Sequence, residues 1–229
     1  MIGPSQRSAM IGVSLDSKCF TREWVRYAIS HTLGKHKDVE LFLGDRLLSY
    51  NRTFRENGSE AGVDFENTRR RITHRRSEVA SFLQSEIARL GSHDQARIRI
   101  ADWSHYSDCA FQDLFRQLQI AYVALPAFRN CVEHDVSAHF TSPPRANHAE
   151  VHRALSGLYV VEETAMLIRI TELSDRPYDY YPGNQIFTLS SLYADEFAGQ
   201  GLSIQSLTGK PKARVFTPLP GPGSVQSEF

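Results

Sequence analysis

The chain has 229 residues, which suits one domain with a sizeable core, and its 26 basic and 26 acidic side chains leave no net charge, so an anionic partner must be held by a local patch. Three cysteines at irregular spacing argue against a disulfide framework and favour a reducing compartment. No stretch approaches the roughly 18 apolar residues of a membrane span, and the first residues lack a signal peptide's apolar segment, so we expect a cytoplasmic protein without membrane contact.

The first half of the chain predicts alternating strands and helices. In order, these are a strand at 8–14, a helix after Thr21, a strand at 38–43, a helix at 65–90 and a strand at 97–101. Thr21 is placed to cap a helix with one apolar face formed by Trp24, Val25, Ala28 and Ile29. The polar residues 51–64 predict a loop, and Gly91 is expected to end the long helix.

The second half is mainly helical. Helices are predicted at 108–123, 128–140, 147–173 and 190–198, and Pro126 separates the first two. The sequence YDYYPG at 178–183 is predicted to be an aromatic loop, followed by a strand at 186–189. Strands alternating with helices indicate an α/β fold, a single Rossmann-like domain over 1–217 with a central, mostly parallel sheet flanked by helices. The turn-rich residues 218–229 predict a flexible tail.

Two polar residues, Ser14 and Asp45, follow the first two predicted strands. Ligands of parallel α/β sheets bind at the carboxyl ends of strands, so Ser14 is a candidate nucleophile, although a serine here can also simply cap the next turn. The chain has no GxGxxG, GxxxxGK[ST] or GxSxG motif. His148 and His152 are four residues apart but lack the HExxH pattern, so we read them as solvated helix residues. Cys131 lacks the second half of a metal motif, so we read it as a core residue.

The segment 69–76 reads RRRITHRR and concentrates positive charge on a predicted helix. Its arginines are Arg69, Arg70, Arg71, Arg75 and Arg76. Glu66 and Glu78 flank the run and are not expected to neutralise it. A solvated helix face and a binding site for nucleic-acid phosphates both fit this pattern. No base-reading motif accompanies the arginines, so we expect contact with the nucleic-acid backbone.

Tyr159 and Glu163 are spaced to share one face of a partly apolar helix. A carboxylate on a buried face must have a partner or a purpose, and beside a phenol it can hold an ammonium group and accept its proton. The alternatives are that Glu162 faces inward instead, or that Glu163 pairs with a structural arginine such as Arg129. The tyrosines of 178–183 are either functional or a cover for the sheet.

Four features in this order resemble the cyclodipeptide synthases: GVSLDS at 12–17, the arginine-rich helix, YVVEETA at 159–165 and YYP at 180–182. The likeness extends from Met10 to Tyr193 and includes LFLGDRLLSYN at 41–51. The resemblance implies an aminoacyltransferase that joins the aminoacyl groups of two aminoacyl-tRNAs into a cyclic dipeptide, a 2,5-diketopiperazine. It also implies a fold like the catalytic domains of class Ic aminoacyl-tRNA synthetases, with no ATP and no metal.

The resemblance also assigns residues. It implies covalent intermediates on Ser14, an amino-group site at Tyr159 and Glu163, a loop tyrosine at Tyr181, and tRNA binding by the five arginines. Ser17 with Tyr181 and Pro182 fits the X-Tyr-Pro branch of the family. The residues expected to line the substrates are Met10, Gly12, Ser17, Leu41, Leu43, Met166, Asp179 and Pro182. An acid at Asp179 would favour a polar or basic substrate side chain.

The expected partners are two aminoacyl-tRNAs, with no obligate protein partner. One alternative is a non-catalytic tRNA-binding module on a synthetase-like fold, which would need the arginines but not Ser14, Tyr159, Glu163 and Tyr181 together. Another is a serine hydrolase, which would need a His–Asp pair close to Ser14.

Overall fold

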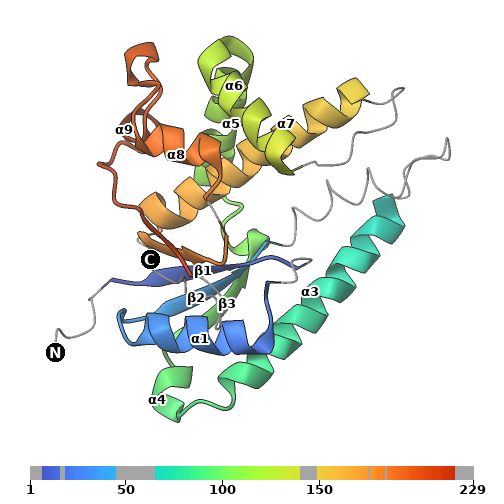
Figure 1. Cartoon of the computed structure of the whole chain (residues 1–229), viewed down its shortest axis with the longest axis vertical. Coiled ribbons are helices and arrows are strands. Elements are labelled where there is room, and N and C mark those ends of the chain that lie inside the picture. Colours follow the sequence, from blue (N-terminus) through green and yellow to red (C-terminus); the bar gives the residue numbers. More distant parts are fainter. Residues whose placement is uncertain are drawn as a thin grey trace, which may run out of the picture.

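The computed structural model describes residues 7–15, 19–44, 65–139, 149–174, 176–183 and 185–219, and for 65–69, 139 and 149–153 it describes the backbone only. In these parts the chain forms one sheet between two layers of helices (Figure 1). All its strands are parallel, in the order β3-β2-β1-β4-β5. They are β1 (Ala9–Val13), β2 (Val39–Leu43), β3 (Ile98–Asp102), β4 (Tyr178–Tyr181) and β5 (Val215–Pro218). The predicted Rossmann-like α/β fold is confirmed.

One face of the sheet is covered by α1 (Arg22–Leu33), α3 (Phe65–Ile87) and α4 (Ser92–Gln95). Thr21 caps α1 as predicted, because its side-chain oxygen accepts a hydrogen bond from the Trp24 N–H at 3.2 Å. The core on this side joins Trp24 and Ile29 of α1 to Ile11 and Val13 of β1. We call this the α1 face of the sheet.

The other face is covered by the remaining helices, and we call it the α7 face. They are α5 (Cys109–Ala124), α6 (Pro126–His139), α7 (Ala149–Ile168), α8 (Phe187–Tyr193) and α9 (Ile204–Thr208). The shorter turns are 3-10 turns at Trp103–His105 and Ala198–Gln200 and a π-helical turn at Arg169–Leu173. The core on this side contains Met10 and Phe42 from the sheet together with Met166 from α7.

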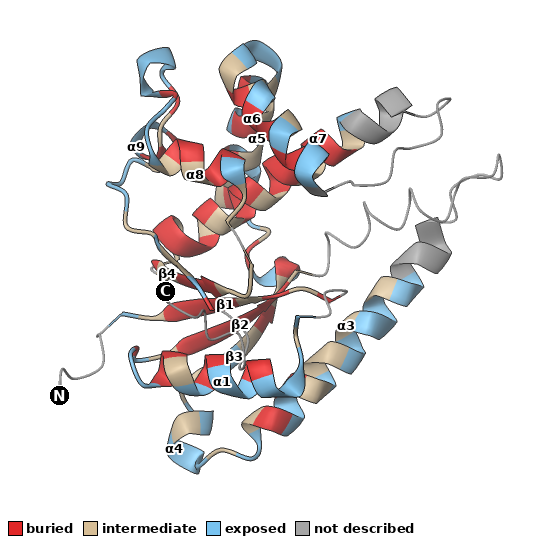
Figure 2. Cartoon of the chain, in the orientation of Figure 1, coloured by how far each residue is buried: buried red, intermediate tan, exposed pale blue. Residues whose placement is uncertain are grey.

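The central strands β1 and β2 are buried on both faces of the sheet, whereas α3 is largely exposed where its side chains are described (Figure 2). Successive side chains of a strand point to opposite faces. In β1 the residues of the α7 face are Met10 and Gly12, while Ile11 and Val13 belong to the α1 face. Parallel pairing aligns Gly12 with Phe42 of β2. These alternations decide which side chains can meet at the carboxyl edge of the sheet.

Two predictions for the segment after Pro177 are wrong. Residues 178–181 form strand β4 rather than a loop, because aromatic side chains suit a pleated surface and β1 offers a free edge for parallel pairing. Residues 186–189 begin helix α8 rather than a strand. The buried Asp135 of α6 accepts hydrogen bonds from the N–H groups of Phe187 and Thr188, both at 2.8 Å, and thereby caps α8 from a distant part of the chain.

The structure also revises three boundaries. Helix α3 ends at Ile87, and Gly91, with φ −64°, precedes the unpredicted short helix α4 instead of providing a left-handed cap. Pro126 is the first residue of α6, where its missing N–H costs nothing. Strand β5 was not predicted: Pro218 belongs to it and Leu219 is buried, so the sheet includes the first residues of the expected tail. Residues 220–229 lie outside the described part of the chain.

Candidate active site at the carboxyl ends of the strands

Ser14 stands one residue beyond the carboxyl end of the central strand. The pairing of β1 with β2 continues to this point, since the Gly44 N–H donates to the Val13 carbonyl at 2.9 Å. Ser14 is half-buried, and the next residue, Leu15, is fully packed into the core of the α1 face. The hydroxyl therefore sits at the edge where ligands of parallel sheets bind, as predicted. The second such residue, Asp45, lies outside the described residues.

Tyr181 lies beside Gly12, two residues before Ser14, with its ring between two glycines. A Cβ added to Gly12 would stand 3.2 Å from Cδ2 of Tyr181, and one added to Gly183 would stand 3.2 Å from Cε1. At both positions a larger residue would require the tyrosine ring to shift by a few tenths of an ångström, and neither glycine has a positive φ. Burial, followed by the charge of Glu163, raises the pKa of Tyr181 to about 12.

Tyr159 and Glu163 approach from α7 and are hydrogen-bonded through their side chains. Burial raises the pKa of Tyr159 well above its ordinary value, and the charge of Glu163 and the proximity of Tyr181 act in the same direction. Glu163 therefore acts on both phenols, which brings Tyr159, Glu163 and Tyr181 into one cluster beside Gly12. Three elements, β1, β4 and α7, supply the cluster and the adjoining Ser14.

The alternatives for Glu163 can now be judged. Glu162 does face inward and is fully buried, while Glu163 is half-buried at the cluster, so the two carboxylates do not exclude one another. Arg129 donates to the backbone carbonyls of Tyr122, at 3.0 Å, and of Val123. Its guanidinium thus serves the junction between α5 and α6.

The residues predicted to line the substrates fall on two sides of the sheet. Met10 and Met166 are fully buried together in the core of the α7 face. Leu41 and Leu43 belong to the α1 face, opposite to that core, so the predicted pocket cannot include them beside Met10 and Gly12. Because β2 is buried on both faces, its sequence VELFL does not by itself indicate which of its apolar side chains face α7. Among them, Phe42 belongs to the core of the α7 face.

Two further members of that set flank Tyr181. Pro182 is half-buried directly after it, and Asp179 precedes it in β4, buried and in an ion pair with Arg214. The guanidinium of Arg214 also lies over the rings of Tyr193, at 5.6 Å, and Phe216, at 5.4 Å. An internal cation thus already balances the Asp179 carboxylate, which argues against the expected preference for a basic substrate. Ser17 lies outside the described residues.

The arginine-rich segment lies in the first half of α3, and its described arginines have different contacts. Arg70 and Arg71 are exposed. Arg75 Nε donates to the Leu15 carbonyl at 3.1 Å, and Arg76 pairs with Asp102 at 3.3 Å. The side chain of Arg69 lies outside the description.

Glu78 is more than a flanking acid on this helix. It pairs with His74 at 3.3 Å and with Arg75 at 3.0 Å. The expectation that Glu78 would leave the arginine run unneutralised is therefore wrong for the part of α3 next to the sheet, since side chains three and four residues apart meet on a helix.

A His–Asp pair also lies at the carboxyl edge, at the end of β3. Nδ1 of His105 is 2.9 Å from Oδ1 of Asp102, and the same carboxylate accepts from the Ser104 N–H at 3.0 Å. These contacts cap the 3-10 turn that follows β3. Strand β2 lies between β3 and β1, and two strand spacings amount to about 10 Å, so Asp102 is beyond hydrogen-bond reach of Ser14.

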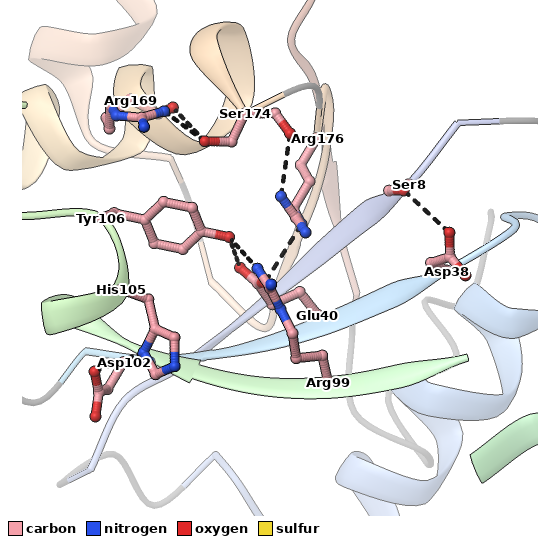
Figure 3. A network of polar contacts seen from close by, with 10 residues as sticks. All are labelled: Ser8, Asp38, Glu40, Arg99, Asp102, His105, Tyr106, Arg169, Ser174 and Arg176. Carbon is pink, nitrogen blue, oxygen red and sulfur yellow. Dashed lines mark hydrogen bonds and ion pairs between the residues drawn. The ribbon is translucent and has the colours of Figure 1, made fainter. Parts of the chain in front are cut away.

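A buried ionic network lies nearer the opposite end of the sheet (Figure 3). The Glu40 carboxylate, 1% exposed, accepts from Arg99 Nε at 2.7 Å and from the Tyr106 hydroxyl, and Arg176 Nε lies 3.4 Å away. Burial, followed by the hydrogen bond to Glu40, raises the pKa of Tyr106. A pocket of about 190 Å³ at the amino ends of the strands is lined partly by these side chains. Their charges are satisfied internally, so we assign the network to stability.

Among the residues that the structure describes, no three His, Cys, Asp or Glu side chains are grouped to hold a metal ion. Over the same ranges, no helix is both long and apolar enough to cross a membrane.

No protein-family model and no curated protein matches the sequence, whereas solved structures match the whole fold. A cyclodipeptide synthase from Fluoribacter dumoffii superposes with a TM-score of 0.71 at 15% identity, covering 92% of this chain and 88% of that one. One from Candidatus Glomeribacter gigasporarum, bound to Phe-tRNAPhe, gives 0.64 at 12% identity over 100% and 96%. The chain has the fold of the cyclodipeptide synthases.

The same fold relates these enzymes to class I synthetases. The tyrosyl-tRNA synthetase of Aeropyrum pernix matches with a TM-score of 0.53 at 15% identity, covering 94% of this chain but 53% of the synthetase. Within the cyclodipeptide synthase fold, the sequence prediction missed three contacts close to the candidate site. They are Phe42 facing α7, Arg75 on the Leu15 carbonyl, and Arg214 on Asp179. Strand register could have indicated Phe42, but no local pattern indicates the two arginine contacts.

Proposed function

We propose that the protein is a tRNA-dependent cyclodipeptide synthase of the X-Tyr-Pro branch, which joins the aminoacyl groups of two aminoacyl-tRNAs through an aminoacyl-enzyme on Ser14. The observation that carries the proposal is the cluster of Tyr159, Glu163 and Tyr181 beside Gly12, two residues before Ser14, in a chain with the cyclodipeptide synthase fold. A solved protein of this fold is bound to Phe-tRNAPhe. The branch rests on Ser17, Tyr181 and Pro182.

The proposed reaction begins with an ester exchange. Ser14 Oγ attacks the ester carbonyl of the first aminoacyl-tRNA, a new ester forms on Ser14, the bond to the ribose oxygen breaks, and the hydroxyl proton ends on that oxygen. The amine of this aminoacyl-enzyme then attacks the ester carbonyl of a second aminoacyl-tRNA, the bond to the second ribose oxygen breaks, and a dipeptidyl ester remains on Ser14. Finally, the free amine of the dipeptide closes on this ester and releases the ring. Both later steps convert an ester into an amide, so they need no ATP.

The electrostatics of the cluster assign roles to its members. At neutral pH both phenols keep their protons, because the pKa values of Tyr159 and Tyr181 are raised, the latter to about 12. Each phenol can therefore donate a hydrogen bond but is a poor base. Glu163 is then the group that holds the substrate ammonium and accepts its proton before the amine attacks. Tyr181 positions the aminoacyl group.

The arginines of α3 are proposed to hold the tRNA backbone. Guanidinium groups bind phosphates with a strong salt dependence and carry no sequence information by themselves. Arg70 and Arg71 are exposed on the half of α3 that extends beyond the sheet (Figure 1). We include Arg69 in the proposal on sequence grounds alone.

The test is capture of the covalent intermediate. Purified protein is mixed with total bacterial tRNA charged with radiolabelled amino acids, and label on the protein is located by peptide mass spectrometry. We expect label on Ser14, cyclic dipeptides in the medium of an expressing bacterial culture, and loss of both in Ser14→Ala. Ser85→Ala, at an exposed position of α3, is the matched control. Product formation by a folded Ser14→Ala variant would disprove the nucleophile.

The same experiment separates the alternatives. A non-catalytic tRNA-binding module would bind the tRNA without acquiring label. A serine hydrolase based on His105 and Asp102 would lose activity in His105→Ala, whereas the proposed synthase would not, because that pair stands two strands away from Ser14.

A further inference from the structure

Helix α3 is fastened to the carboxyl edge of the sheet by two successive arginines. Arg75 Nε donates to the carbonyl of Leu15, the residue directly after Ser14, at 3.1 Å. Arg76 Nη1 lies 3.3 Å from Oδ2 of Asp102, the last residue of β3. Both contacts join the helix to strand ends, and the first reaches the backbone of the residue that follows the candidate nucleophile.

The charge of Arg75 is used within the chain. Besides the Leu15 carbonyl it binds Glu78, with Nη1 3.0 Å from Oε2. The hydrogen bond to Arg75 is the main cause that lowers the pKa of Glu78, so this carboxylate is charged at neutral pH. A phosphate that approached Arg75 would have to compete with both partners. Arg71 lies four residues earlier, about 6 Å along the helix axis.

We infer that Arg75 is a positioning residue for Ser14 and not one of the tRNA contacts. This inference rests on the proposed function and revises one part of it. The guanidinium holds the carbonyl of Leu15, the residue directly after Ser14, while the buried side chain of Leu15 anchors the same residue in the core of the α1 face. The two restraints fix the orientation from which the Ser14 hydroxyl attacks an ester.

It follows that two parts of helix α3 have different roles. The first half of α3 would hold the tRNA backbone, and Arg75 would connect the same rigid helix to the nucleophile. Helix α3 would then fix the position of a bound aminoacyl-tRNA relative to Ser14. A misplacement of about 1 Å between reacting groups can cost about 100-fold in rate, so this connection is expected to affect the chemical step.

The test compares Arg75→Ala with Arg70→Ala in two measurements. The first is the rate of label transfer to the protein at saturating, charged total bacterial tRNA. The second is the Kd for uncharged tRNA as a function of salt. For Arg75→Ala we expect a transfer rate about 10- to 100-fold lower with a Kd changed less than twofold. For Arg70→Ala we expect a higher Kd and a salt slope reduced by about 0.7 to 0.9.

Two further variants sharpen the comparison. Arg75→Lys keeps a donor that can reach the Leu15 carbonyl and is expected to restore part of the transfer rate. Arg116→Ala, an exposed arginine on α5, is the control that leaves both measurements unchanged. Arg75 is itself 44% exposed, so its removal is not expected to unfold the protein.

Hydrogen exchange supplies a readout that does not depend on catalysis. Amides of residues 14–20 are expected to exchange faster in Arg75→Ala than in wild type, and not in Arg70→Ala. The inference is overturned if Arg75→Ala weakens tRNA binding and the salt slope as Arg70→Ala does, or if transfer and exchange are both unchanged. A wild-type protein that binds tRNA but never acquires label would instead refute the proposed function, and with it the role of Arg75.

Discussion

The ring of Tyr181 packs between Gly12 and Gly183, so closely that a Cβ at either glycine would stand 3.2 Å from a ring carbon. At the residue scale this contact explains why β1 carries a glycine two residues before Ser14. Burial is the main cause that raises the pKa values of Tyr159 and Tyr181, and the charge of Glu163 is the second. Burial and this carboxylate therefore act together to keep both phenols protonated.

Removal of that charge gives a prediction at this scale. Glu163→Gln keeps the size and a hydrogen bond to Tyr159 but cannot accept the ammonium proton. We expect label still to reach Ser14 while cyclic dipeptide formation falls about 100-fold, so that labelled protein accumulates. We also expect the pKa of Tyr181 to move down from about 12, because the charge that raised it is gone. Mass spectrometry of product and ultraviolet titration against Tyr181→Phe measure the two effects.

Glu23→Gln, an exposed change in the first turn of α1, is the control for this prediction. A Glu163→Gln protein that makes product at the wild-type rate would remove Glu163 from proton transfer.

At the element scale, helix ends are held by side chains from other elements. Asp135 of α6 caps α8, and Asp108 caps α5 by accepting from the Phe111 N–H at 3.0 Å. Asp108 also binds Arg169, in the π-helical turn after α7, with 2.9 Å between Arg169 Nε and Oδ1. The carboxylate therefore joins the start of one helix to the end of another.

Asp108 gives a pH-dependent prediction. The hydrogen bond from Arg169 is the main cause that lowers the pKa of Asp108 from 3.8 to about 2. A lowered pKa means that the stabilisation is complete above pH 3.8 and is lost as the pH falls through 2. Asp108→Asn, which still caps a helix, should cost at most about 1 kcal/mol at pH 7, because the carboxylate is partly exposed. Asp108→Ala should cost about 1 kcal/mol more.

Urea unfolding between pH 7 and pH 3 checks this expectation. The difference between wild type and Asp108→Asn should be constant down to about pH 4 and should shrink below it. A difference that persists unchanged to lower pH would show that it does not arise from the charge of Asp108.

At the scale of the whole molecule, Glu40 connects parts that are far apart in sequence. Its carboxylate lies on β2 and binds Arg99 of β3, Tyr106 after the 3-10 turn and Arg176 before β4 (Figure 3). Removing one partner of a buried ionic cluster leaves the others uncompensated. The network thus holds the sheet and the segment leading into β4 in one arrangement.

The corresponding prediction concerns global stability. Glu40→Ala should lower the free energy of unfolding by about 3 kcal/mol and the Tm by about 6–12 °C. Asp38→Ala, two residues earlier with a 3.5 Å contact to Ser8, should change the free energy by less than about 0.5 kcal/mol. Chemical and thermal denaturation measure the free energy of unfolding and the Tm of both variants. Equal effects would show that the buried network does not stabilise the fold more than the Asp38 contact does.

The elements that the sequence predicted correctly are those with a local cause. The strands around Ile11 and Leu41 are short apolar runs, the α1 helix has an apolar face and its Thr21 cap, and α7 carries Tyr159 and Glu163 four residues apart. The motifs from Gly12 to Tyr181 also led to the fold that the solved structures share. These signals lie within a few residues of the structure they specify.

Contacts between distant segments decided the rest. Residues 178–181 became a strand because β1 was available as a partner, and α8 begins where Asp135 of α6 caps it. The face of the sheet on which Leu41 and Leu43 lie depends on strand register. The hydrogen bond from Arg75 to the Leu15 carbonyl depends on how α3 packs against the end of β1. The sequence by itself determined the first three strands, most of the long helices and the candidate chemical groups. Only the tertiary structure decided which of them meet, because pairing and packing energies arise between residues that the chain order keeps apart.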